Sequence, residues 1–273
     1  MFRTSIRNEP NSGFEKYAYL AQLLGNTEEG LQMARRGIEV IKAESRSIDS
    51  EMEHERIMEL QQYEASAHCA IAEICLGIIE DSNDQEVATK LDVEVEKSVM
   101  AAIGLSEEGS ESEVEAMLSL ANLRLSQGRR DDAVESMKRV LLRMSPGLEM
   151  LETGDQSDVI IAEALSRLPS LEFRIAVGKQ LIEVEMWRAA IVNLSSVMWE
   201  CDFNVEVWYL LAVAYWKLGE FKEAQSVLIS TRAVLRSPDG FDGELDEAMI
   251  GKLEQQLVRG AGPGKAGHDA MQE

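Results

Sequence analysis

The most constraining feature of this chain is a helical pattern that recurs after 34 residues. Ala190 and Ala224 are 34 positions apart, and each is preceded by apolar residues at helical spacing. In the clearest copy, Trp208 and Tyr215 share one helix face, and Gly219 comes shortly after them. Glycine readily ends a helix in the left-handed conformation. The pattern therefore predicts pairs of helices joined by tight turns.

Small residues at fixed offsets identify the type of repeat. Ala212 and Ala224 are 12 positions apart in the last copy, and Ala121 and Ala133 are 12 apart in a middle copy. Such small residues let the two helices of a hairpin approach closely, while large residues fill the space between hairpins. This arrangement is the tetratricopeptide pattern.

The sequence therefore predicts an all-α fold, a right-handed superhelical tetratricopeptide-repeat (TPR) solenoid over 11–259. About five helix hairpins are expected near 11–44, 62–108, 114–147, 171–204 and 205–238, followed by a capping helix over 243–259. The capping helix is expected because apolar residues repeat there every four positions, at Leu245, Met249, Leu253 and Leu257. A solenoid needs such a helix to cover its last apolar face.

Several segments depart from the repeat. The acidic segment 44–60 is expected to be a linker or an extended helix. About 14 extra residues, rich in Asp and Glu, separate the two helices of the second hairpin. The insert 148–170 carries one more apolar helical patch, at Val159, Ile160, Ala162 and Leu165. The glycine-rich tail 260–273 is expected to be disordered.

Charge and composition narrow the function. The formal net charge of −22 argues against binding to nucleic acid or to an anionic membrane and favours a basic partner. No stretch approaches 18 uncharged apolar residues, so no membrane span is expected. The three cysteines are an odd number and fit a reducing compartment, and the start of the chain does not resemble a signal peptide.

No catalytic, metal or cofactor site is expected. His54, His68 and His268 have no partner at metal-ligand spacing, and His68 does not converge with Cys69 and Cys75 along one helix. The tail sequence GAGPGKAG lacks the first glycine and the hydroxyl residue of a phosphate loop. We therefore expect a protein that is not an enzyme.

The inner helices of the hairpins predict a binding surface. In a TPR solenoid, the first helix of each hairpin faces a concave groove. In the first two hairpins the inner positions are Ser12, Glu15, Tyr19, Gln22, Leu23, Tyr63, Ser66, Ala70, Glu73 and Ile74. The 25 inner positions of all five hairpins hold six carboxylates and two lysines.

An acidic and aromatic groove suits a peptide rich in arginine and lysine. Carboxylates accept bidentate hydrogen bonds from guanidinium groups, and aromatic faces attract cations. The residues predicted to bind such a partner are Glu206, Tyr209, Glu172, Trp216, Glu115, Glu73, Glu183, Glu15, Tyr19 and Asn122. The alternative is that these carboxylates only keep the surface soluble.

A resemblance to a known family rests on four segments, in this order: NSGFEKYAYLAQLLG, AHCAIAEICL, LSLANLRLSQGRRDDAVESMKRVL and FNVEVWYLLAVAYWKLGEFKEA. They resemble the fungal dedicated chaperones of large-subunit ribosomal protein number four. The match covers roughly 11–230, and its most specific parts are 67–70, 126–129 and 204–209. The segment 44–60 and the tail depart from the family.

The resemblance implies a function. Such a chaperone captures the newly made ribosomal protein in the cytoplasm and shields its long basic loop in the concave groove. It then accompanies this client to the nucleus, where a nuclear import receptor would be met through the client. Neither direct nucleic-acid binding nor membrane binding is implied. Glu206 lies in the matching Glu-Val-Trp-Tyr stretch, so it is the first candidate for client binding.

Two other functions stay open at this point. An adaptor for the acidic tails of heat-shock chaperones would need basic and amide residues on the inner helices. Only Asn122 and Lys179 are suitably placed. Four carboxylates would repel an acidic tail: Glu15, Glu115, Glu172 and Glu206. The other is a scaffold subunit of a larger complex, which would recognise a folded surface instead of a basic peptide.

Overall fold

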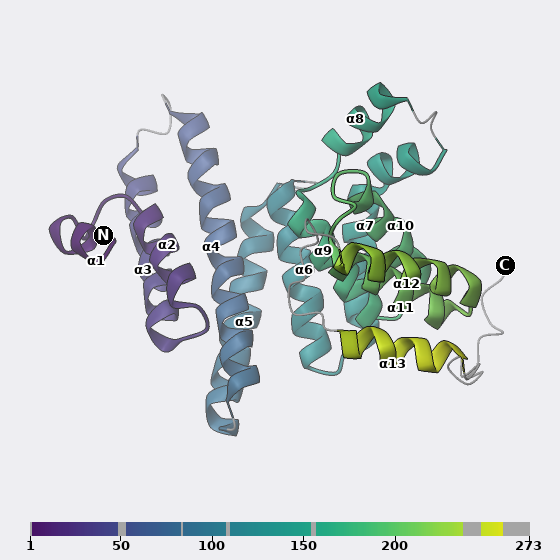
Figure 1. Cartoon of the computed structure of the whole chain (residues 1–273). Helices are drawn as coiled ribbons and strands as arrows, with labels where there is room; N and C mark the ends of the chain where they lie inside the picture. Colours follow the sequence, from purple (N-terminus) through teal and green to yellow (C-terminus); the bar gives the residue numbers. More distant parts are fainter. Residues whose placement is uncertain are drawn as a thin grey trace. The chain divides into compact units, whose positions relative to one another are not determined.

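The computed structural model describes residues 2–48, 53–82, 84–107, 110–153, 157–236 and 247–258, and every regular element among them is a helix. The helices are α1 (Phe2–Asn8), α2 (Glu15–Leu24), α3 (Glu28–Ser47), α4 (His54–Asp81), α5 (Gln85–Leu105), α6 (Glu111–Ser126), α7 (Arg130–Thr153), α8 (Asp158–Ser166), α9 (Leu171–Glu183), α10 (Trp187–Met198), α11 (Val205–Leu218), α12 (Phe221–Leu235) and α13 (Glu247–Val258). Figure 1 follows them from purple at the N-terminus to yellow. The predicted all-α class is confirmed.

The chain divides into two compact units, Met1–Val140 and Leu141–Glu273. In the first unit, α2 pairs with α3 and α4 pairs with α5, and α6 packs against both α4 and α5. In the second unit, α9 pairs with α10 and α11 pairs with α12. The single continuous solenoid over 11–259 stays a prediction.

Turns between paired helices depend on glycine and on side-chain caps. Gly25, Gly128 and Gly219 have φ values of 59°, 69° and 86°, in the left-handed region that favours glycine. Thr27 caps α3, because its hydroxyl oxygen accepts a hydrogen bond from the Gly30 amide at 3.0 Å. The turn positions that glycine marks in the sequence are therefore turns in the structure.

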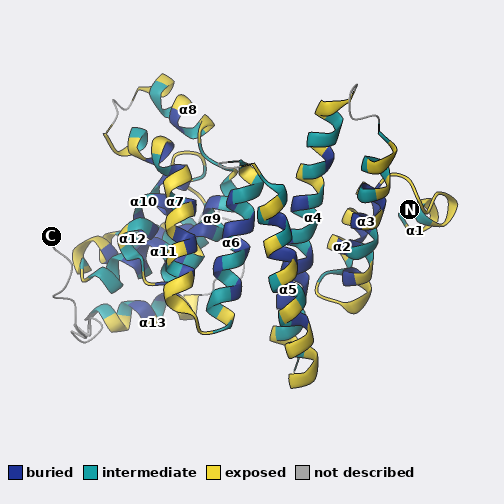
Figure 2. Cartoon of the chain, turned by 180° about the vertical axis from the view of Figure 1, so that it is seen from behind, coloured by how far each residue is buried: buried dark blue, intermediate teal, exposed yellow. Residues whose placement is uncertain are grey.

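The expected acidic insert of the second hairpin is not a separate segment. It lengthens the two helices instead, so that α4 has 28 residues and α5 has 21. The added turns carry apolar residues that join a core cluster, among them Leu76 on α4 and Leu91 on α5. Figure 2 shows buried residues along both helices. Asp84 caps α5 by accepting a hydrogen bond from the Glu86 amide at 2.9 Å.

The segment 44–60 is mostly helical. Its start extends α3 to Ser47, and α4 begins at His54, while 49–52 lie outside the described residues. The insert 148–170 contains α8, as its apolar patch predicts, but the buried residue there is Ala164. Val159 of the expected patch is 76% exposed.

Within the segment expected to form a capping helix, α13 packs on α11 and α12. Its buried side chains are Ile250 and Leu253. Met249, which the four-residue spacing placed on the packed face, is exposed, so the buried face is shifted. Leu245 and the tail 260–273 lie outside the described residues.

A buried arginine joins α9 to α10. Arg174 is 1% exposed and donates hydrogen bonds to the Ser196 carbonyl at 3.0 Å, the Ser196 hydroxyl at 3.2 Å and the Pro169 carbonyl at 3.1 Å. It also forms an ion pair with Glu200. Asn193 donates to the Arg174 carbonyl at 2.7 Å. Arg174 shares a buried helix face with Val177 and Leu181, although the repeat pattern does not predict a buried arginine there.

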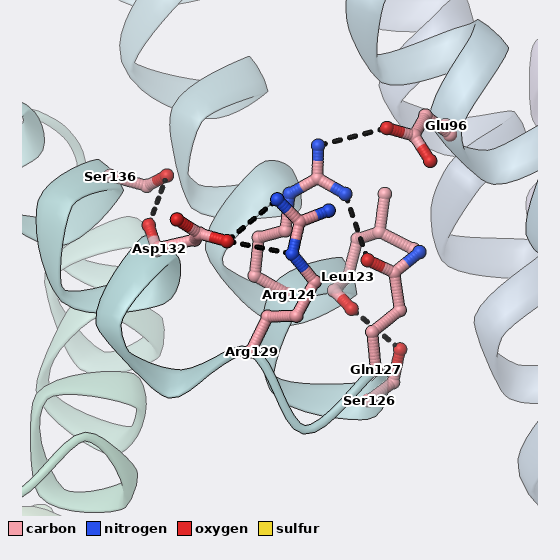
Figure 3. A network of polar contacts seen from close by, with 8 residues as sticks. All are labelled: Glu96, Leu123, Arg124, Ser126, Gln127, Arg129, Asp132 and Ser136. Atoms are coloured by element: carbon pink, nitrogen blue, oxygen red, sulfur yellow. Dashed lines mark hydrogen bonds and ion pairs between the residues drawn. The ribbon is translucent and has the colours of Figure 1, made fainter.

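The turn at 126–129 is held by a second polar network, drawn in Figure 3. Arg124 donates to Gln127 at 2.8 Å and to Glu96 on α5 at 2.9 Å. The hydrogen bond from Arg124 lowers the pKa of the Glu96 carboxyl. Arg129 pairs with Asp132 at 2.6 Å. Arg124 and Arg129 are therefore engaged in contacts within the chain, and Arg124 links α6 to α5.

Candidate functional site

The N-terminal unit contains a cavity of about 450 Å³ between α2, α3 and α4. Seven of the ten inner positions predicted for the first two hairpins line it: Tyr19, Gln22, Tyr63, Ser66, Ala70, Glu73 and Ile74. The repeat template therefore brings these positions of α2 and α4 together even where the copies are weak. Ala18 and Asn26 also line the cavity, and the template does not assign them.

The aromatic part of this wall is accessible. Tyr19 is 55% exposed and Tyr63 is 42% exposed. One side of each ring is occupied, because Tyr19 stacks on Phe2 with centroids 5.6 Å apart and Tyr63 lies 4.8 Å from Phe14. These contacts fix the rings on the cavity wall. Aromatic rings held in this way can receive an apolar or cationic group.

Two predicted carboxylates lie on helices that pack against each other in this unit. Glu73 is on α4, and Glu115 is on the neighbouring helix α6. Ser66 links the cavity to Glu115, because it lines the cavity and donates a hydrogen bond to Glu115 at 3.2 Å.

The surroundings of these two carboxylates disfavour negative charge. Desolvation raises the pKa of Glu73, although this side chain is exposed to solvent. Desolvation also raises the pKa of Glu115; the hydrogen bond from Ser66 lowers it, and the charges of Glu73 and Glu111 raise it by smaller amounts. A cation bound here would offset both effects. The arrangement is thus suited to a positively charged ligand.

The other predicted residues of this unit lie apart from the cavity. Glu15 is exposed in the first turn of α2, and Asn122 is half-buried on α6. Neither lines the cavity. Their part in binding stays a prediction.

In the C-terminal unit, Glu206 is paired within the chain. Lys179 on α9 lies 2.8 Å from its carboxylate, and both side chains are partly exposed. Lys179 was itself an inner position of the template. Glu206, the first candidate for partner binding, is therefore already paired with Lys179 in the free protein. Glu172 and Glu183 are exposed near the two ends of α9.

Tyr209 and Trp216 were expected as exposed groove residues, but both are half-buried. They pack against a cluster of Ala212, Leu228, Ile250 and Leu253, because α13 lies against this side of the last hairpin. Burial raises the pKa of the Tyr209 phenol. The nitrogen of Lys217 lies 4.8 Å from the centre of the Trp216 ring, so this ring already holds a cation.

The described residues offer little reactive chemistry. Cys69 and Cys75 are buried, and burial raises the pKa of the Cys69 thiol and raises that of Cys75 to about 12. Thiols of this kind are poor nucleophiles. Within the same ranges, no group of three His, Cys, Asp or Glu residues could hold a metal ion. No helix there is both long and apolar enough to span a bilayer.

Comparisons with known proteins agree with this architecture. Two family models described as tetratricopeptide repeat match residues 116–149 and 205–229. A curated relative is the "probable assembly chaperone of rpl4" of Schizosaccharomyces pombe, which is 26% identical over 218 residues. The alignment covers 77% of this chain and 55% of the relative, so the chain spans about half the length of that relative.

A solved structure also resembles this chain. It is the assembly chaperone of RpL4, Acl4, residues 1–338, with a TM-score of 0.64 and 22% sequence identity. The likeness covers 82% of this chain and 77% of that one. The tetratricopeptide-repeat fold is therefore confirmed, and so is the resemblance to chaperones of this ribosomal protein.

Proposed function

We propose that this chain is a dedicated chaperone of a large-subunit ribosomal protein of the rpl4 type. It binds a basic, extended loop of the newly made protein and escorts this client from the cytoplasm to the nucleus for ribosome assembly. The observation that carries the proposal is the similarity over 218 residues to the S. pombe probable assembly chaperone of rpl4.

The electrostatics of the chain support a basic client. The net charge of −22 favours association with a cationic protein. The raised pKa values of Glu73 and Glu115 favour a cation beside these two carboxylates. A loop rich in arginine and lysine binds RNA without sequence preference, and an acidic surface competes for that loop. The role requires no catalytic step.

A pull-down with this chain as bait tests the proposal directly. The source is a lysate that contains newly made ribosomal proteins, and the bound proteins are identified by mass spectrometry. We expect one basic large-subunit ribosomal protein, of the rpl4 type, to be enriched far above the others. A broad set of basic proteins would refute a dedicated client. Heat-shock chaperones alone would favour the adaptor function instead.

The Glu206–Lys179 pair allows a sharper test on the purified complex. If Glu206 binds the client, Glu206→Gln should weaken binding. Lys179→Met should strengthen it, because that change frees the carboxylate and removes a repelling charge. Exposed ion pairs contribute at most about 1 kcal/mol, so each change should alter the affinity by about three- to fivefold. If the pair only stabilised the fold, Glu206→Gln and Lys179→Met would both weaken client binding.

A further inference from the structure

The cavity between α2, α3 and α4 has a definite chemical character. Its walls are mainly apolar and aromatic, with Ala18, Ala70 and Tyr63 among the lining residues. Glu73 provides the only carboxylate among these lining residues. A mainly apolar cavity with one carboxylate on its wall matches a side chain that has an apolar stem and a cationic end.

Among the described residues, no ion pair or hydrogen bond joins the Glu73 carboxylate to a basic side chain. Glu73 is exposed to solvent at the edge of the cavity, and desolvation by the surrounding protein raises its pKa. Its charged neighbour on α6 is Glu115, which carries the same sign. Charge complementarity therefore calls for a cation from outside the chain.

We infer that this cavity is a recognition pocket for one arginine side chain of the basic client loop, with Glu73 receiving the guanidinium group. The inference rests on the proposed function, and it adds the residue type that is recognised and the place where it binds. The aliphatic stem of the arginine lies between Ala18 on α2 and Ala70 on α4. Tyr19 and Tyr63 border the planar group.

Arginine fits this pocket better than lysine for two reasons. Its planar guanidinium stacks on aromatic rings and forms two parallel hydrogen bonds with a carboxylate. An ammonium group is more strongly hydrated and loses more on entering an apolar cavity. The pocket would thus select a particular position of the loop, whereas the other carboxylates of the chain attract basic residues in general.

Two variants close or neutralise the pocket without touching the core. Ala18 is exposed, so Ala18→Trp adds an indole at the cavity wall, and Ala43→Trp is its control on an exposed site of α3 outside the cavity. Glu73→Gln removes the charge. Its control is Glu80→Gln, because Glu80 lies two turns further along the same face of α4 and outside the cavity. Circular dichroism and thermal unfolding check that all four variants fold like the wild type.

The first experiment uses small probes and does not depend on the client. N-acetyl-arginine methylamide and N-acetyl-lysine methylamide are titrated into the full chain and followed by NMR. The arginine probe should bind at least fivefold more tightly than the lysine probe. Ala18→Trp and Glu73→Gln should abolish this preference, and the two control variants should keep it. Equal binding of the two probes to the wild type would overturn the inference.

The second experiment uses the ribosomal protein as client, with each loop arginine changed to lysine in turn so that its charge is unchanged. One position should stand out, with about tenfold weaker binding to the wild-type chain. The same client change should cost less than twofold against Ala18→Trp. Equal losses against both chains would show that the selected arginine binds elsewhere and would overturn the inference.

The two experiments separate this inference from the proposed function. A chain that binds the arginine probe in the pocket but does not bind the ribosomal protein has the pocket and a different client. If the wild type and Ala18→Trp bind the ribosomal protein equally well, the chain is a chaperone of this type without an arginine pocket.

Discussion

Arg174→Ala is expected to lower the free energy of unfolding by about 3 kcal/mol. The side chain is 1% exposed, and the change removes its hydrogen bonds to Pro169 and Ser196 and its ion pair with Glu200. Removing one partner of a buried ion pair costs about 3–5 kcal/mol. We place the loss at the lower end because Glu200 is partly exposed and regains water.

Urea unfolding followed by circular dichroism measures this loss. The slope m is about 1–3 kcal/mol per M for small proteins, so the midpoint should fall by about 1 M or more at unchanged slope. The matched control is Arg188→Ala, since Arg188 also pairs with a glutamate, Glu220 at 2.6 Å, but its side chain is 65% exposed. The control should lose less than about 1 kcal/mol. Equal losses in the two variants would refute the structural role assigned to Arg174.

Three further outcomes are expected. Gly219→Ala should lower the free energy of unfolding by about 1–2 kcal/mol in the same urea assay, because φ is 86° and no atom lies near the added methyl group. A thiol reagent should modify the partly exposed Cys201 first and reach Cys69 only on unfolding, so rapid labelling of Cys69 in the native protein would contradict its burial. The pKa values of Glu73 and Glu115 are raised, so these groups take up protons above the ordinary value of 4.5 as the pH falls. As these carboxylates become protonated above pH 4.5, the affinity for a basic client should fall. The same protonation should raise the free energy of unfolding, because the folded chain binds these protons more tightly than the unfolded chain does. Glu115→Gln should reduce the pH dependence of binding measured by calorimetry, and an unchanged profile would count against its role.

Local sequence signals predicted most of the fold. The 34-residue spacing, the small alanines and the turn glycines act within one helix hairpin, where short-range packing and backbone conformation decide the structure. This is why Gly219 and Ala224 are found in their predicted roles. The helical template also placed Tyr19 and Glu73 on one surface, since helical periodicity orders side chains by face.

What periodicity does not determine is which neighbouring helix covers a given face. Only tertiary packing places Lys179 against Glu206, and it directs the α13 helix toward Tyr209. It also makes Arg174 a core residue and places Glu73 on the wall of the cavity. Hydration and charge pairing depend on contacts between residues far apart in sequence. The sequence by itself therefore determined the repeat, its turns and its acidic character. The tertiary structure decided that Glu206 forms an ion pair with Lys179 and that Glu73 lines a cavity.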